Sequence, residues 1–339
     1  MQAAPPGPRR GGGPTRRLLA AALVVVAATL AACGGSGGTT AAAPGTWSVA
    51  VHPEAKTLPA GYASIYGVSC PTPTFCAAVD ESGDALFWNG STWSTPVPAQ
   101  AGNTLNSVSC TSATFCVAVG GQLAITWNGH TWSAPAAVGP APTGPNGGQY
   151  EVSCVSPTFC ASVNTAGVAS LFDGTGWGHD AVVDDGTATK PVQNIACAST
   201  TMCVVVSATG NIGTFNGTTW SRQPSPGQSL LHSVSCPTTR FCMAVDLTGH
   251  ALVYDGTAWT SAAPMSGGAA LTYSVSCPTA STCSVARSDG SVATWQDGTW
   301  AQPVQVLHDG TIATADISCA STTFCALVDS AGSLATSKA

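Results

Sequence analysis

Residues 105–135, LNSVSCTSATFCVAVGGQLAITWNGHTWSAP, contain the pattern that decides the fold. Short runs of Val, Ile, Thr and aromatic residues alternate with turns of Gly, Ser and Asn, which predicts four short β-strands. Cys110 and Cys116, with five residues between them, lie on the first two strands. The segment 127–132 (WNGHTW) joins the last two strands, and Asn-Gly between apolar strand ends predicts a hairpin with positive φ at both residues.

The same unit occurs seven times along the chain. Apart from Cys33, the cysteines form seven such pairs, and the first members of successive pairs are 40, 44, 43, 39, 41 and 42 residues apart. The pairs are Cys70 and Cys76, Cys110 and Cys116, Cys154 and Cys160, Cys197 and Cys203, Cys236 and Cys242, Cys277 and Cys283, and Cys319 and Cys325. Four strands per repeat at this period are typical of propeller blades, and the 3.6-residue periodicity of helical repeats is absent. The sequence therefore predicts an all-β, seven-bladed β-propeller with four-stranded antiparallel blades.

The two ends of the repeat region complement each other. The seventh repeat ends at residues 334–339 (LATSKA) without a fourth strand, whereas residues 45–48 (GTWS) match the start of a fourth strand before the first repeat. We therefore expect the N-terminal strand to complete the last blade and close the ring. Closure of this kind removes the exposed edges that an open array of sheets would present.

Each cysteine pair is expected to form a disulfide within its blade. Cysteines that flank a short hairpin connection can bring their Cα atoms within the roughly 4.4 to 6.8 Å that a disulfide requires. Export to an oxidising compartment favours such bonds. A zinc site would need two pairs to converge, but pairs on adjacent blades are spread around a ring, so we predict no metal and no cofactor.

Residues 1–32 have the composition of an export signal. Four arginines precede an apolar run of thirteen residues, which is too short to cross a hydrocarbon layer of about 30 Å as a helix. LAAC (30–33) resembles the bacterial lipobox, and this resemblance implies that Cys33 carries a diacylglyceryl group and becomes the first mature residue. Acyl chains such as palmitate would then hold the protein at the extracytoplasmic face of the cell membrane. Residues 33–45 are expected to be a flexible linker, and residues 46–339 the propeller.

The charge balance excludes one class of partner. The chain has ten Lys and Arg against 16 Asp and Glu, a net charge of −6. All four arginines of the signal are lost on cleavage, which leaves six basic against 16 acidic residues and a net charge of −10. Nucleic acid is therefore excluded, because phosphate binding requires clustered Lys and Arg. We expect a monomer with an unidentified glycan or protein ligand.

The whole mature chain resembles the seven-bladed propellers of secreted actinobacterial proteins, whose repeat has the form SVSCxxxxFCxAV…WNGxxWS. The recurring DGTxW turn is also distantly similar to the Asp-box of sialidase-type propellers, but the preceding Ser and the Asp-x-Gly spacing are absent. A WD40 propeller is disfavoured, because no blade carries the Gly-His and Trp-Asp pair. The propeller resemblance implies that ligands bind around the mouth of the central channel. The aromatic pair of each turn is interpreted as blade packing.

The position four residues before each first cysteine predicts a ring of side chains at this mouth. It varies from blade to blade, unlike the repeated Val or Ile two residues later, and such variation is expected of a site added to a symmetric scaffold. The candidate ligand-binding residues are Tyr66, Asn106, Tyr150, Gln193, His232 and Tyr273, with Glu151 and Asp316 one position further along. The alternative is that these polar groups only hydrate a water-filled channel.

The sequence favours binding over catalysis. HExxH, GxSxG and P-loop motifs are absent, so no catalytic residue is predicted. The preferred function is a non-catalytic binding or scaffold module of the cell envelope for a glycan, peptide or protein. The alternative is a carbohydrate-active hydrolase or lyase with Glu151 and Asp316 as paired carboxylates, although blades three and seven lie nearly opposite each other. The three mature arginines occupy unlike repeat positions, which argues against a sialidase-type grip on a substrate carboxylate.

The lipid anchor can be tested at one atom. Cys33→Ser removes the sulfur that would carry the lipid, so the protein should leave the membrane fraction or remain uncleaved, as read by fractionation and intact mass. Normal membrane retention of this variant would show that Cys33 is not lipidated.

Overall fold

The computed structural model describes Met1 and residues 46–48, 50–52, 63–139, 150–184, 191–227, 230–265, 268–308 and 312–337. The expected signal segment, Cys33 and the linker lie outside these ranges, so lipidation stays a prediction. Within the ranges, no helix is long and apolar enough to cross a membrane.

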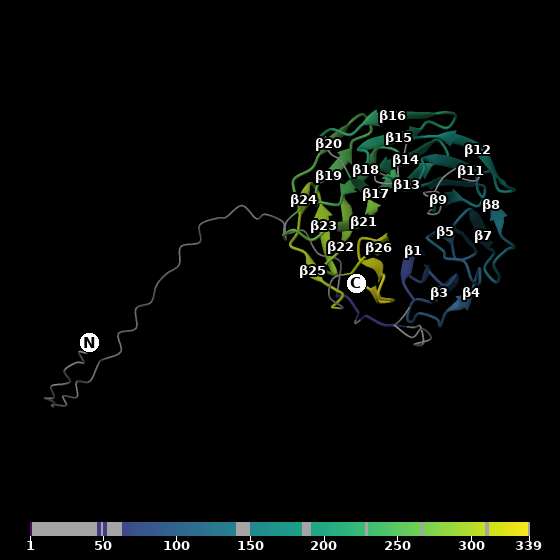
Figure 1. Cartoon of the computed structure of the whole chain (residues 1–339), viewed down its shortest axis with the longest axis horizontal. Helices are drawn as coiled ribbons and strands as arrows, with labels where there is room; N and C mark the ends of the chain where they lie inside the picture. The colour runs from purple at the N-terminus through teal and green to yellow at the C-terminus, as the bar shows by residue number, and fades with distance from the viewer. Residues whose placement is uncertain are drawn as a thin grey trace, which may run out of the picture. The chain divides into compact units, whose positions relative to one another are not determined.

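All regular structure in the described ranges is β-sheet, arranged as seven antiparallel blades around a central channel (Figure 1). Blades one to three contain β1 (Ile65–Thr72), β2 (Phe75–Asp80), β3 (Asp84–Trp88), β4 (Val97–Pro98); β5 (Ser107–Ser112), β6 (Phe115–Gly120), β7 (Leu123–Trp127), β8 (Ala136–Ala137); β9 (Tyr150–Ser156), β10 (Phe159–Asn164), β11 (Val168–Phe172) and β12 (Trp177–Val182). Blades four and five contain β13 (Val192–Ser199), β14 (Met202–Ser207), β15 (Asn211–Phe215), β16 (Trp220–Pro224); β17 (Leu231–Thr238), β18 (Phe241–Asp246), β19 (Ala251–Tyr254) and β20 (Trp259–Ser261). Blades six and seven contain β21 (Thr272–Thr279), β22 (Thr282–Arg287), β23 (Ser291–Gln296), β24 (Thr299–Trp300), β25 (Val304–Gln305); β26 (Ala315–Ser321), β27 (Phe324–Asp329) and β28 (Leu334–Thr336).

Strand order within each blade follows chain order, and the first strand is innermost. The first strands β1, β5, β9, β13, β17, β21 and β26 contact one another in turn, and β26 contacts β1 (Figure 1). The second strand of each blade is almost completely buried, because neighbouring blades cover both of its faces. Seven apolar clusters result, one at each boundary between adjacent blades. The core is therefore a ring of interfaces, and the predicted all-β, seven-bladed fold is confirmed.

The N-terminal strand closes the last blade as the sequence predicts. Val51 and Leu334 exchange both backbone N–H···O bonds, at 2.8 and 2.9 Å, and Trp47 pairs with Ser337. These contacts join positions almost 290 residues apart on the outer side of β28, where the seventh repeat lacks its own fourth strand.

All seven expected disulfides are present within the described residues, each inside one blade. Their Cα–Cα distances are 3.9 to 4.1 Å, slightly below the expected range. The reason is that partners such as Cys197 and Cys203 lie directly opposite each other on paired strands. Directly opposed residues approach most closely where the ladder bonds are widely spaced.

The prediction for the hairpin turns is wrong in the first five blades. Gly90 has the expected positive φ of 93°, but among described non-glycine residues only His179, Leu230 and Asp297 have positive φ. The longer turns instead use the Asn or Asp side chain, as Asn89 Oδ1 accepts the N–H groups of Ser91 and Thr92 at 3.0 and 2.9 Å. Among the described turns, only the shorter turn of blade six has the predicted positive φ at both residues, with 47° at Asp297 and 91° at Gly298.

A belt of hydrogen bonds joins the innermost strands of adjacent blades. The serine just before each first cysteine accepts, at 2.9 to 3.0 Å, the N–H of the first cysteine in the next blade. The pairs are Ser69 with Cys110, Ser109 with Cys154, Ser153 with Cys197, Ser235 with Cys277, Ser276 with Cys319, and Ser318 with Cys70. At the boundary of blades four and five the repeat has Ala196, so the N–H of Cys236 lacks this hydroxyl partner.

The gap in this belt predicts a stabilising substitution. Ala196→Ser should supply the missing acceptor and raise the free energy of unfolding by about 0.5 to 1 kcal/mol, while Ser153→Ala should lower it by about 1 kcal/mol. Guanidinium unfolding with the disulfides intact measures both. Ala258→Ser, the same atomic change on an exposed turn, is the control and should leave stability unchanged. A destabilised Ala196→Ser protein would contradict the proposed role of the belt.

Candidate functional site

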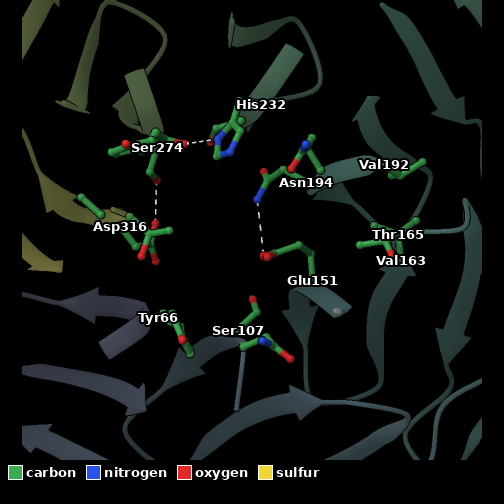
Figure 2. Close-up of a pocket in the computed structure, with 17 residues that line it drawn as sticks. Tyr66, Ser107, Glu151, Val163, Thr165, Val192, Asn194, His232, Ser274 and Asp316 are labelled. Atoms are coloured by element: carbon green, nitrogen blue, oxygen red, sulfur yellow. Dashed lines mark hydrogen bonds between the residues drawn. The ribbon is translucent and has the colours of Figure 1, made fainter. Parts of the chain in front are cut away.

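A cavity of about 170 Å³ lies among the innermost strands at the mouth of the channel (Figure 2). It is lined by residues three and four positions before each first cysteine, together with Val163, Thr165, Val192 and Thr314. Tyr66, Asn106, Glu151, Gln193, His232, Tyr273 and Asp316 all face it, as do Asn194, Ser233 and Ser274. The structure thus gathers seven of the eight candidate residues around one space. The side chain of Tyr150 lies outside the described part, although its backbone begins β9.

Charged side chains at the cavity carry only one sign. The residues that line it include two carboxylates and no Lys or Arg. Arg222 lies on β16 instead and pairs with buried Asp184 at 3.0 Å, while Arg287 is buried at the end of β22. The sequence-based argument against a sialidase-type arginine triad agrees with this arrangement.

Asn194 and Asp316 belong to a second belt that the sequence analysis missed. In five of the seven described blades, the side-chain oxygen three positions before the first cysteine accepts a backbone N–H from the next blade, as Ser233 does from Val275 at 3.1 Å. Asn194 Oδ1 makes the same bond to Val234 at 3.2 Å, and Asp316 Oδ2 to the Val68 N–H at 2.9 Å. The signal was the first Ser of the repeated SVSC motif, which a polar residue replaces in these blades.

Asp316 is held firmly by its surroundings. Its Oδ1 accepts from the Ser274 hydroxyl at 2.6 Å and from its own following amide, that of Ile317, at 2.9 Å (Figure 2). Burial raises the pKa of Asp316, and the bonds from Ser274, Val68 and Ile317 oppose that rise. Its structural task is to join blade seven to blade one.

Glu151 occupies a belt position without being part of the belt. Its carboxylate receives a long bond, at 3.5 Å, from the Asn194 side-chain amide (Figure 2) and has a second hydrogen-bond partner in Ser107. Burial raises the pKa of Glu151 to about 8; the negative charge of Asp316 adds to the rise, and a hydrogen bond with Ser107 opposes it. The two predicted carboxylates therefore influence each other across the cavity, although they come from opposite blades.

His232 presents a hydrogen-bond acceptor to the cavity. Its Nδ1 lies 2.6 Å from the Tyr273 carbonyl oxygen, and because a carbonyl can only accept, Nδ1 carries the proton. Burial lowers the pKa of His232, so the ring is neutral near pH 7 and Nε2 has a free lone pair. Tyr273 packs beside this ring, with centroids 6.0 Å apart, and donates its hydroxyl to the Ile312 carbonyl at 3.3 Å.

The aromatic pairs of the outer turns serve packing, as the sequence predicts. Trp88 and Trp93 have ring centroids 5.8 Å apart within blade one. Phe87 reaches Trp127 of blade two at 4.7 Å, and Trp88 reaches Phe324 of blade seven at 6.2 Å. These rings join neighbouring blades far from the channel mouth.

Fold and site together define a seven-bladed β-propeller with an acidic cavity at one end of its channel. Solved structures show the same fold at low identity: YCF48 bound to D1 peptide has a TM-score of 0.65 and 18% identity, covering 89% of this chain and 99% of the other. YCF48 from Cyanidioschyzon merolae has a TM-score of 0.63, 14% identity and coverages of 86% and 98%. The WD40 propeller domain of Doa1 has a TM-score of 0.67 and 14% identity, covering 86% of this chain and 96% of the other. No protein-family model and no curated protein matches the chain.

Stability should depend on pH through the cavity. The pKa of Glu151 is raised from 4.5 to about 8 in the folded protein, so the folded state holds this proton longer than the unfolded state. The free energy of unfolding therefore falls as pH rises from about 4.5 through 8. We expect a melting temperature several degrees lower at pH 8.5 than at pH 5.5. Glu151→Gln should remove much of this difference, and an unchanged pH profile would show that Glu151 is not the cause.

Proposed function

We propose that this protein is a lipid-anchored, non-catalytic binding module of the cell envelope that receives part of a peptide or protein ligand at the channel mouth. The observation that carries this proposal is the asymmetry of the cavity. The outer strands repeat the same packing residues in nearly every blade, but the seven innermost strands present different polar side chains to one space. A single binding event needs such asymmetry, whereas hydration of a channel does not.

The size of the cavity favours a peptide over an oligosaccharide. At about 170 Å³ it is smaller than the roughly 300 to 1,000 Å³ of sites that enclose a small molecule. One side chain or chain end fits such a space, and the rest of the ligand would lie on the surrounding loops. A glycan ligand would need a longer groove with several ring-sized subsites.

The alternative of a carbohydrate-active hydrolase has less support. Glu151, with its raised pKa, has the protonation state of a general acid at neutral pH. Its partner Asp316, however, accepts three hydrogen bonds, which come from blade one (Val68), from blade six (Ser274) and from its own backbone (Ile317). A carboxylate in that role is poorly placed to act as a nucleophile or to activate water.

The fold gives a further, general argument for a peptide ligand. The structure of YCF48 contains a D1 peptide, so a ring of this fold can take a peptide as ligand. At 18% identity this comparison concerns the fold alone. Propellers host many functions, and the argument for this chain therefore depends on the cavity.

Site-specific photocrosslinking tests the proposal on the full-length protein in its own membranes. A photoreactive residue at Gln193, on the cavity wall, should capture an envelope protein, whereas one at Thr257, on an exposed outer turn, should not. Tyr273→Ala should reduce capture, with a loss of affinity of about 1 to 3 kcal/mol. Trp93→Ala should lower thermal stability and leave the affinity of the folded fraction unchanged. Capture only from Thr257, or affinity that follows Trp93 and ignores Tyr273, would place the site on the rim and contradict the proposal.

A further inference from the structure

We propose that the channel mouth takes a lysine side chain of the ligand, with an apolar residue beside that lysine lying on Leu230 and Leu271. This inference rests on the proposed function and names the chemistry of the ligand. Three features of the described residues carry it: acceptors with no Lys or Arg among them, a space sized for one side chain, and two exposed leucines, each two residues before a cavity residue.

The cavity offers hydrogen-bond acceptors to a cation. Glu151 and Asp316 contribute carboxylates, and His232 contributes the lone pair of Nε2, because its Nδ1 proton is already donated to Tyr273 (Figure 2). Within the described residues, no Lys or Arg lines the space to neutralise these carboxylates. An ammonium group has three donors and no acceptor, so it complements this set. A carboxylate or phosphate would meet like charge instead.

The walls suit the stem of a lysine as well as its head. Tyr66 and Tyr273 face the cavity from blades one and six, and Val163 and Val192 lie on its other side. Lysine buries its methylene stem along apolar and aromatic surface while its ammonium reaches polar groups. Aromatic rings also attract cations at their faces. A volume of about 170 Å³ suits a single long side chain inserted from outside.

Two exposed leucines precede residues of the cavity in the chain. Leu230 and Leu271 occupy equivalent positions, six before the first cysteines of blades five and six, and their exposed fractions are 37% and 43%. Each is two residues before a cavity residue, His232 or Tyr273, which is about 7 Å along an extended chain. Strands β17 and β21, which follow them, pack side by side. Leu230 also has a φ of 61°, a conformation that bulky residues rarely adopt.

The binding of a cation should follow the ionisation of Glu151. The other titratable residues that line the same cavity are Asp316 on β26, His232 on β17, Tyr66 on β1 and Tyr273 on β21. Burial raises the pKa of Glu151 to about 8 in the folded protein, so lysine binding at neutral pH must displace a proton. Free lysine keeps its charge to about pH 10.4. Affinity for a lysine peptide should therefore rise from pH 6 to pH 9.

The test uses full-length protein in detergent and the pentapeptide Gly-Leu-Lys-Leu-Gly, acetylated at its amino terminus and amidated at its carboxyl terminus. Two further peptides are the same sequence with acetyl-lysine at the centre, and Gly-Leu-Gly-Leu-Gly with a free amino terminus. Calorimetric titration at pH 7.0, where lysine and a free amino terminus are both charged, should show at least tenfold tighter binding of the lysine peptide than of either other peptide. Equal binding of the free amino terminus would assign the site to chain ends and overturn the lysine proposal.

Two variants, each with a change at one proposed contact, test which residues recognise the lysine peptide. Glu151→Gln should reduce the lysine preference about tenfold and abolish its rise with pH, with thermal unfolding as the folding check. The matched control is Asp255→Asn, which removes the same charge from an exposed outer turn where blades one, two and four already have Asn89, Asn128 and Asn216. This control should bind as the wild type does. Leu271→Asn, a change at an exposed site, should weaken binding of the lysine peptide about threefold or more.

The outcomes separate this inference from the proposed function. If the lysine and acetyl-lysine peptides bind equally while photocrosslinking from Gln193 still captures an envelope protein, the lysine inference is wrong and the binding function stands. If Asp255→Asn weakens binding as much as Glu151→Gln does, the attraction comes from net charge and the inference is also wrong. If no peptide binds and Gln193 captures nothing, both are wrong.

Discussion

The hydrogen bonds between innermost strands are the interaction on which the ring depends. No backbone ladder joins one described blade to the next, because every sheet is confined to its own blade. Apolar packing holds the faces together but does not fix their register along the channel. Side-chain oxygens one and three positions before each first cysteine supply that register by accepting N–H groups from the adjacent blade. The disulfides do not hold one blade to the next, since each joins two strands of the same blade.

The same belts decide which side chains remain available at the channel mouth. Positions used by the belts are tied to a neighbouring blade, as Asp316 is to Val68, whereas the position before them is free to vary. Two blades are exceptions: Gly67 has no side-chain oxygen, and among the described contacts Glu151 accepts no backbone N–H from the next blade but bonds to the side chains of Asn194 and Ser107. A buried carboxylate with so few donors costs stability when it ionises. Retaining such a group is consistent with a ligand that supplies the missing positive charge.

The proposed binding function depends on the shape and charge of the cavity and not on the fold. The fold is shared with YCF48 and WD40 proteins at 14 to 18% identity, so it carries no specific activity by itself. The structure has a small acidic cavity lined by His232, and the exposed Leu230 and Leu271 each come two residues before a cavity residue in the chain. These features favour recognition of a single protruding side chain over cleavage of a polymer.

The sequence alone determined the architecture, because periodicity records it directly: seven cysteine pairs at spacings near 40 residues fix the number of blades, and the unpaired GTWS segment shows how the ring closes. It also pointed to the ring of residues at the mouth, through variation against a repeated background. It did not show that Asn194 and Asp316 replace belt serines, nor that Asn89 shapes its turn through its side chain, since both depend on which atom faces which neighbour. Only the tertiary structure brought Glu151 and Asp316, 165 positions apart, close enough to raise the pKa of Glu151. Burial and charge act through space, and no spacing along the chain records them.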